Sequence, residues 1–176
     1  MIIALSKTIK LKYLLSNALW NLNRMINKIL VATDASAASN RALEMAAQFA
    51  LQHDAELHVI HVIRDMQIPF DIKEIPELES DQFESFNEVR EGILRKVAES
   101  VLRAARDKAE KAGATKVKTA IGTGDPASSI LGFAKRRKVD MIVIGTRGLG
   151  KLKGTILGSV SRKVTNNAET SCLIVR

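Results

Sequence analysis

The chain has 176 residues, of which 46% are hydrophobic and 26% charged, a balance typical of one globular domain with a proper core. The formal net charge is +8, but four of the basic residues lie in the first 24 residues, where there is no acid. The remainder is only mildly basic, which does not by itself indicate nucleic-acid binding. A single cysteine excludes an intramolecular disulfide and fits a reducing, cytoplasmic location.

Residues 1–24 differ from the rest of the chain, because they are basic and contain the only Tyr and the only Trp. Their apolar run is interrupted by Ser16-Asn17, so it does not have the apolar core of a secretory signal, and a membrane span needs roughly 20 apolar residues. We predict an extension outside the fold, arising from an upstream start codon or a loose segment. A surface-binding amphipathic segment is the alternative. The folded domain is expected over residues 25–176, and no membrane partner is expected for it.

The first half of this domain predicts strand, helix and strand. Residues 29–32 are a continuous apolar run, as in a strand buried on both faces, and residues 57–63 form the second strand. Between them Ser36 or Ser39 can cap a helix. Apolar residues at helical spacing form its predicted inner face: Leu43, Ala46, Ala47, Ala50 and Leu51. Residues 64–88 are acidic and contain two prolines, which predicts an irregular lid or surface excursion without assigned chemistry.

The second half continues the alternation of helices and strands. A helix over residues 88–112 ends at Gly113, and a half-exposed edge strand comes next, near Val117. Asp125-Pro126 fits the N-cap and first position of the next helix. A strand over 141–144, a last helix and a short strand over 172–175 close the chain. The inner face of the 88–112 helix is predicted from its apolar residues: Leu94, Val97, Ala98, Val101 and Ala105. This alternation predicts an α/β fold, a single-domain doubly wound parallel sheet with helices on both faces.

The segment from Met141 to Ser161 has the composition of a phosphate-binding loop. An apolar strand ends at Gly145, Gly148 comes three residues later, and Gly158-Ser159 begins a helix after nine intervening residues. Gly145 would leave room for a ligand, and Gly148 can adopt a positive φ that turns amides inward. The N-terminus of the last helix offers further amides at its positive end.

Two better-known phosphate motifs fit this sequence only in part. Gly145-x4-Gly150-Lys151 resembles a P-loop, but Leu152 stands where Ser or Thr would hold Mg²⁺. Gly122-x-Gly124-x-x-Ala127 imitates a dinucleotide fingerprint, but the acidic residue near the required offset, Asp140, precedes a strand at the wrong end of the sheet. Neither motif is therefore assigned.

Gly145-x2-Gly148-x9-Gly158-Ser159 resembles the ATP-binding subgroup of the universal stress protein family. The resemblance covers about residues 25–176 and includes the Asp34-Ala35-Ser36 turn, the 57–62 strand and the Gly124-Asp125-Pro126 turn. It implies a five-stranded sheet of order 3-2-1-4-5, similar to the adenine nucleotide alpha hydrolases. Strands one and four are then neighbours, and Asp34 faces Gly145 across the crevice where such sheets bind ligands.

The resemblance also implies a nucleotide site. Asp34 can accept hydrogen bonds from ribose hydroxyls, although an Asx cap on the following helix is the alternative. The family pattern places Ala32, Val62 and Ile144 around the adenine, with backbone groups of Val62 at the base edge, and Thr33 is included among the nucleotide-binding residues. Gly145 approaches the ribose and α-phosphate. Amides and hydroxyls of the following residues would hold the phosphates: Gly148, Gly158, Ser159, Val160 and Ser161. Arg147, Lys151 and Lys153 could screen phosphate charge, and Arg147 is preferred because it lies between Gly145 and Gly148.

Other candidates are weaker. His53, His58 and His61 lack a metal-binding spacing, and the last two, three apart on a strand, should point to opposite faces. The basic run 135–138 lies at a helix C-terminus, where cations are expected, so no nucleic-acid partner is predicted.

We expect an ATP-binding, nucleotide-responsive regulator of the stress response, which binds ATP with or without Mg²⁺. A turnover enzyme is not expected, because no general base and no Mg²⁺-binding acid is evident beside the loop. The alternatives are a slow ATPase or phosphoryl-transfer enzyme on the same fold, and a nucleotide-free dimeric interaction module. The short apolar strand at the C-terminus would form a sheet edge, and pairing with a second copy would cover it, so a homodimer is expected.

Overall fold

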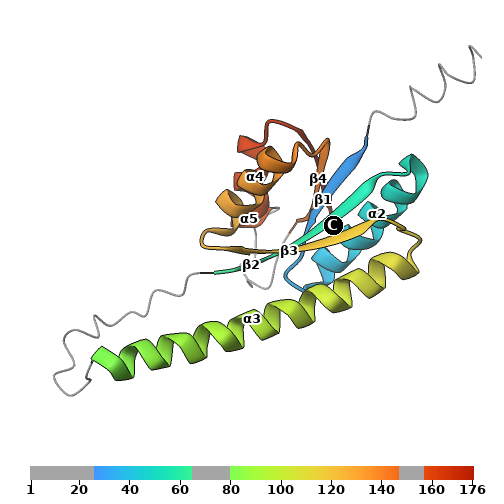
Figure 1. The fold of residues 1–176 in the computed structure, drawn as a ribbon. Helices are drawn as coiled ribbons and strands as arrows, with labels where there is room; N and C mark the ends of the chain where they lie inside the picture. The colour runs from blue at the N-terminus through green and yellow to red at the C-terminus, as the bar shows by residue number, and fades with distance from the viewer. Residues whose placement is uncertain (1–25, 65–79, 147–156) are drawn as a thin grey trace, which may run out of the picture.

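The computed structural model describes residues 26–64, 80–146 and 157–176, which form an alternating series of strands and helices (Figure 1). The elements are β1 (Lys28–Ala32), α2 (Ala37–His53), β2 (Glu56–Ile63), α3 (Ser80–Lys111), β3 (Val117–Thr123), α4 (Pro126–Arg137), β4 (Met141–Gly145), α5 (Ser159–Asn167) and β5 (Ser171–Val175).

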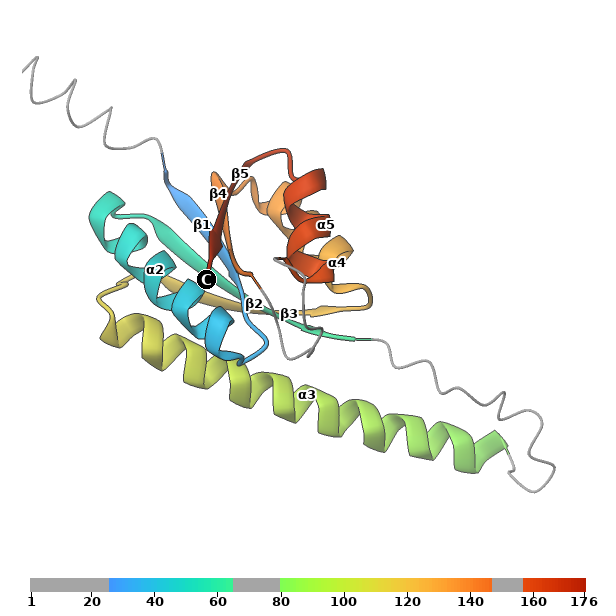
Figure 2. The ribbon, with the colours of Figure 1, turned by 180° about the vertical axis from the view of Figure 1, so that it is seen from behind.

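The five strands form one parallel sheet of order β3-β2-β1-β4-β5, which confirms the predicted fold class and strand order. The central strand is buried on both faces, and Ile29, Leu30 and Val31 are 0% exposed. Two apolar cores flank the sheet. One lies under α2 and α3, and the other under α4 and α5 (Figure 2).

The predicted capping residues are confirmed. Ser36 is the N-cap of α2, and its Oγ accepts a hydrogen bond from the Ser39 amide at 3.2 Å. Asp125 caps α4 in the same way, with Pro126 in the first helical position. Gly113 lies just after α3 with φ +102°, a conformation that strongly favours glycine. These local signals fix where α2 and α4 start and where α3 stops.

Two predicted features of the helices are wrong. Helix α3 begins at Ser80, not near 88, because residues 80–88 contain neither proline nor glycine and acidic residues are favourable in the first turns of a helix. Val97 is 53% exposed, because it precedes the buried Ala98 by one residue and so lies about 100° around the helix from the buried face of α3. Leu102 and Ala109 take the buried positions instead. Leu51 of α2 is likewise 55% exposed.

The topology of the sheet predicts a ligand crevice where β1 ends. The last β1 residue, Ala32, pairs with Ile60, whereas β2 continues to Ile63 and β4 continues to Gly145. Beyond Ala32 the chain turns away into α2, on the side of the sheet opposite α4. The order of winding therefore reverses between β1 and β4, which is where ligands bind in open α/β sheets.

Candidate functional site

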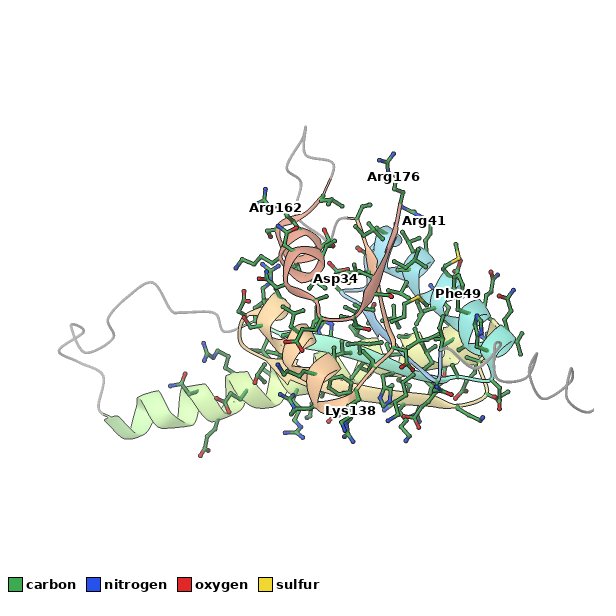
Figure 3. The ribbon with its side chains drawn as sticks, turned by 90° about the horizontal axis from the view of Figure 1, so that it is seen from above. Asp34, Arg41, Phe49, Lys138, Arg162 and Arg176 are labelled. Carbon is green, nitrogen blue, oxygen red and sulfur yellow. The ribbon has the colours of Figure 1, made fainter. Side chains whose placement is uncertain are left out.

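Asp34 lies in the turn between β1 and α2, at the mouth of this crevice. Its side chain is half-buried, and Oδ1 accepts a hydrogen bond from the Ser36 amide at 3.1 Å. This is an Asx turn, so the alternative assignment is right in part, but the helix cap itself is Ser36. A carboxylate has about four acceptor sites, so this bond is compatible with further bonds to hydroxyl groups. In Figure 3, Asp34 is labelled between the ribbons of α5 and α2.

Thr33 and Ala35 hold the same turn from either side of Asp34. Ala35 has φ 63°, in the left-handed region, and its amide donates to Thr33 Oγ1 at 3.2 Å. His61 Nδ1 lies 2.8 Å from the Thr33 carbonyl oxygen. The Thr33 side chain is buried and faces Ser39 Oγ, so it supports the turn rather than lining the crevice.

The backbone of Val62 faces the crevice. Alternate residues of a parallel strand turn their N–H and C=O groups toward the same neighbouring strand. The Ile60 carbonyl accepts from the Thr33 amide on the β1 side, and the Ile63 carbonyl accepts from Gly124 on the β3 side. Val62, two residues after Ile60, therefore points its amide and carbonyl toward the space that β1 has vacated. A planar base could be recognised there by both groups.

Gly145 has a different reason to be glycine from the one predicted. A Cβ at this position would lie 2.8 Å from the Ala38 carbonyl carbon and 2.9 Å from the Ser39 nitrogen. Both are backbone atoms in the first turn of α2. The missing side chain thus lets β4 lie against α2, and the space is filled by protein rather than left for a ligand.

Two of the predicted phosphate donors are used to close a loop. The Gly158 amide donates to the Thr146 carbonyl at 2.7 Å, and Ser161 Oγ donates to the same carbonyl at 2.9 Å. Ser161 is 2% exposed, and its hydroxyl also lies 3.0 Å from the Gly158 carbonyl. The prediction that these two groups bind phosphate directly therefore does not fit their contacts. They join the end of β4 to the start of α5.

The remaining donors are at the N-terminus of α5. Gly158 is the N-cap, with φ −68° and ψ 164°, and as a glycine it has no side chain to cap the helix. The first amides of a helix have no partner within it, so those of Ser159, Val160 and Ser161 depend on groups outside. Such an end favours an anion.

A hollow of about 380 Å³ lies beside this helix end. It is lined by Arg64 after β2, the turn before α4 and three residues of α5: Gly124, Asp125, Pro126, Ser159, Val160 and Lys163. Hydrogen bonds from the amide and hydroxyl of Ser128 hold the pKa of Asp125 below its usual value. Sequence reasoning missed Arg64 and Lys163, because no motif spacing connects the end of β2 with the second turn of α5. A larger hollow of about 480 Å³ lies between α3 and the middle of β3, away from the carboxyl ends of the strands.

The other expected site residues have varied positions. Ile144 is buried, and Ala32 packs against the same core on the α4 side. Arg147, Gly148, Lys151 and Lys153 lie outside the described residues. His58 packs edge-on against Phe133 of α4, whereas His61 contacts the β1–α2 turn, so they lie on opposite faces as predicted.

Within the three described ranges, no group of three or more His, Cys, Asp or Glu residues could hold a metal ion. Nor does any helix in this part of the chain have the length and apolar character needed to cross a membrane.

Comparison with known proteins identifies the family. The model of the universal stress protein family matches residues 25–176. The chain belongs to the universal stress protein family. It is 38% identical over 156 residues to universal stress protein YxiE of Bacillus subtilis, covering 86% of this chain and 100% of that relative.

Solved structures of similar proteins have the same fold. The structure of protein MJ0577 matches with a TM-score of 0.71 and 29% identity, over 86% of this chain and 96% of that one. A universal stress protein solved in complex with cAMP matches with a TM-score of 0.61 and 27% identity, over 86% and 97%.

Proposed function

We propose that this universal stress protein binds an adenine nucleotide, with ATP as the principal ligand, and responds to it as a regulator rather than as a turnover enzyme. The observation that carries the proposal is the start of α5, whose N-cap residue is a glycine without a capping side chain and whose first residues line a hollow with two cationic side chains. Such an arrangement favours a phosphate. The relative solved with cAMP supports the adenine nucleotide class.

Each part of the nucleotide has a matching group in the crevice. The amide and carbonyl of Val62 would bind the edge of the base, with Ala32 and Ile144 against its faces. Asp34 would accept the ribose hydroxyls. The amides of Ser159 and Val160, with the Ser159 hydroxyl, would bind phosphate. Thr146, Gly158 and Ser161 would hold this arrangement through the bonds that join β4 to α5.

A substitution at Gly158 tests the phosphate assignment. The φ of −68° at Gly158 is open to any residue, so Gly158→Val adds bulk at the helix end without backbone strain. We expect isothermal titration calorimetry to show loss of ATP and AMP binding. Gly92→Val is the matched control, because a Cβ at Gly92 meets nothing within 4 Å and Gly92 is on the exposed part of α3. Unchanged affinity in Gly158→Val would contradict the proposal.

The ribose assignment has a test of its own. Asp34→Ala should weaken ATP binding, and it should also remove most of the difference in affinity between ATP and 2′,3′-dideoxy-ATP. If the variant still prefers ATP to the dideoxy analogue as strongly as the wild type does, Asp34 only shapes its turn.

Slow phosphoryl transfer is the rival activity. Among the residues that the structure describes, the carboxylates at this end of the sheet are those of Asp34 and Asp125. Both accept backbone amides of their own turns, and neither is placed as an obvious general base. A single-turnover assay with labelled ATP and Mg²⁺ distinguishes the two. Release of product in less than minutes would favour the phosphoryl-transfer enzyme.

We also propose that β5 pairs with its copy in a second chain. This strand is at the sheet edge and pairs with β4 on one side. The pairing continues just past the end of β4, where the Thr146 amide donates to the Val175 carbonyl at 2.8 Å. An apolar edge strand of this kind is usually covered. Light scattering coupled to size-exclusion chromatography should give twice the chain mass at micromolar concentration, and a monomer would refute the pairing.

A further inference from the structure

We propose that the hollow between the starts of α4 and α5 holds the phosphate tail of the nucleotide, and that Arg64, Lys163 and Asp125 set how many phosphates are preferred. This inference rests on the proposed adenine nucleotide site and adds the groups that distinguish ATP from AMP.

The three side chains come from separate elements and meet in one hollow. Arg64 comes directly after β2, Asp125 caps α4, and Lys163 lies on the second turn of α5. The same hollow is lined by Ser159 and Val160, whose amides are the proposed donors to the first phosphate. A phosphate bound at those amides therefore has the two cations in the same hollow, and a longer tail would bring more negative charge among them.

The charges favour a highly charged ligand, within a limit. Arg64 and Lys163 are cations at neutral pH, and Asp125 is an anion, so the described residues that line the hollow have an excess of one positive charge. AMP carries about two negative charges and ATP about four near neutral pH, so the attraction increases with the number of phosphates.

Asp125 opposes this attraction, and it is held in place. Its Oδ1 accepts from both the amide and the hydroxyl of Ser128, at 3.0 and 2.8 Å, so the carboxylate cannot swing away without uncapping α4. Lys163 Nζ lies 3.6 Å from Asp125 Oδ2, and the two side chains are 61% and 47% exposed. An ion pair this exposed to solvent is weak, so Lys163 can leave Asp125 for a phosphate at little cost.

Three variants of the full chain test the inference by calorimetry with ATP and AMP, in EDTA so that no divalent cation masks the charge. Arg64→Met and Lys163→Met should each weaken ATP binding about 3- to 10-fold, between the effect of an exposed ion pair and that of a charge-assisted hydrogen bond, and AMP binding less. Asp125→Asn should strengthen ATP binding by about 2- to 5-fold, because asparagine caps a helix as well as aspartate does and removes the repulsion. A folding defect cannot produce changes in both directions.

Lys135→Met is the matched control, since it removes another exposed lysine, near the C-terminal end of α4, that also forms an exposed ion pair, with Glu169. It should leave the ratio of the ATP and AMP affinities unchanged. If nucleotides bind but this ratio is the same in wild type, Lys163→Met and Asp125→Asn, the charge assignment is wrong while the nucleotide site stands. If the wild-type chain binds neither ATP nor AMP, the proposed function fails, and this inference with it.

Discussion

Replacing Gly145 with alanine tests the close contact between β4 and α2. The added Cβ would lie 2.8 Å from the Ala38 carbonyl carbon, 2.9 Å from the Ser39 nitrogen and 3.0 Å from the Ala38 oxygen. These are backbone atoms of a helix whose buried face packs against the sheet, so no side chain can rotate aside. The whole first turn of α2 must move by several tenths of an ångström. Overpacking of this kind costs about 1–3 kcal/mol.

The measurement is urea unfolding monitored by circular dichroism, because the only Trp, at position 20, lies outside the described fold. Gly145→Ala should lower the unfolding midpoint with an unchanged slope. Gly92→Ala is the control, since the same methyl group there meets nothing within 4 Å and should stabilise the exposed helix by about 0.5–1 kcal/mol. A Gly145→Ala protein as stable as the wild type would show that α2 yields freely, and the packing explanation for this glycine would be wrong. Because Asp34 lies in the turn that leads into α2, nucleotide affinity should fall as well.

Three further predictions concern stability. Ala35→Gly should leave the free energy of unfolding unchanged or raise it by up to about 1 kcal/mol, because glycine relieves the strain of the left-handed conformation at φ 63°. The control, Ala104→Gly on the exposed face of α3, should lower the free energy of unfolding by about 1 kcal/mol. The opposite order of the two variants in urea unfolding would refute this prediction. Leu102→Ala should lower the free energy of unfolding by about 2–5 kcal/mol and Val97→Ala by less than about 1 kcal/mol, since these side chains are 5% and 53% exposed. Equal losses would mean that Val97 is covered in solution. Burial lowers the pKa of His58 from 6.5, so the native state binds fewer protons than the unfolded state. The free energy of unfolding should therefore fall as the pH drops through about 6.5. This part of the pH dependence should disappear in His58→Leu, and if it persists, it comes from another titrating group.

Local chemistry explains why much of the fold could be predicted. The Asp125-Pro126 pair starts a helix and Gly113 follows the end of one, and each does so through contacts within a few residues along the chain. These helix boundaries can therefore be inferred from the sequence. The continuous apolar runs predict buried strands for the same reason. The strand order came only from the family resemblance, because pairing between β1 and β4 joins residues such as Ile29 and Met141, which are far apart in the chain.

The parts of the site that escaped prediction depend on long-range contacts. Nothing in the sequence near Gly145 indicates that α2 will occupy the space beside it. The spacing of Gly158 and Ser161 suggested phosphate donors, but both groups bond to the Thr146 carbonyl, whose position is set by the end of a different element. Arg64 and Lys163 meet in one hollow through the fold alone.

The carbonyl of Thr146 ties two elements together. By accepting bonds from both Gly158 and Ser161, it fixes the start of α5 against the end of β4. A carbonyl oxygen has two lone pairs, and both are used here, so losing either donor leaves part of this buried junction unsatisfied. The direction of α5 is therefore set by the sheet. The amides at the start of this helix keep one orientation before a ligand arrives, and such preorganisation lowers the entropic cost of binding.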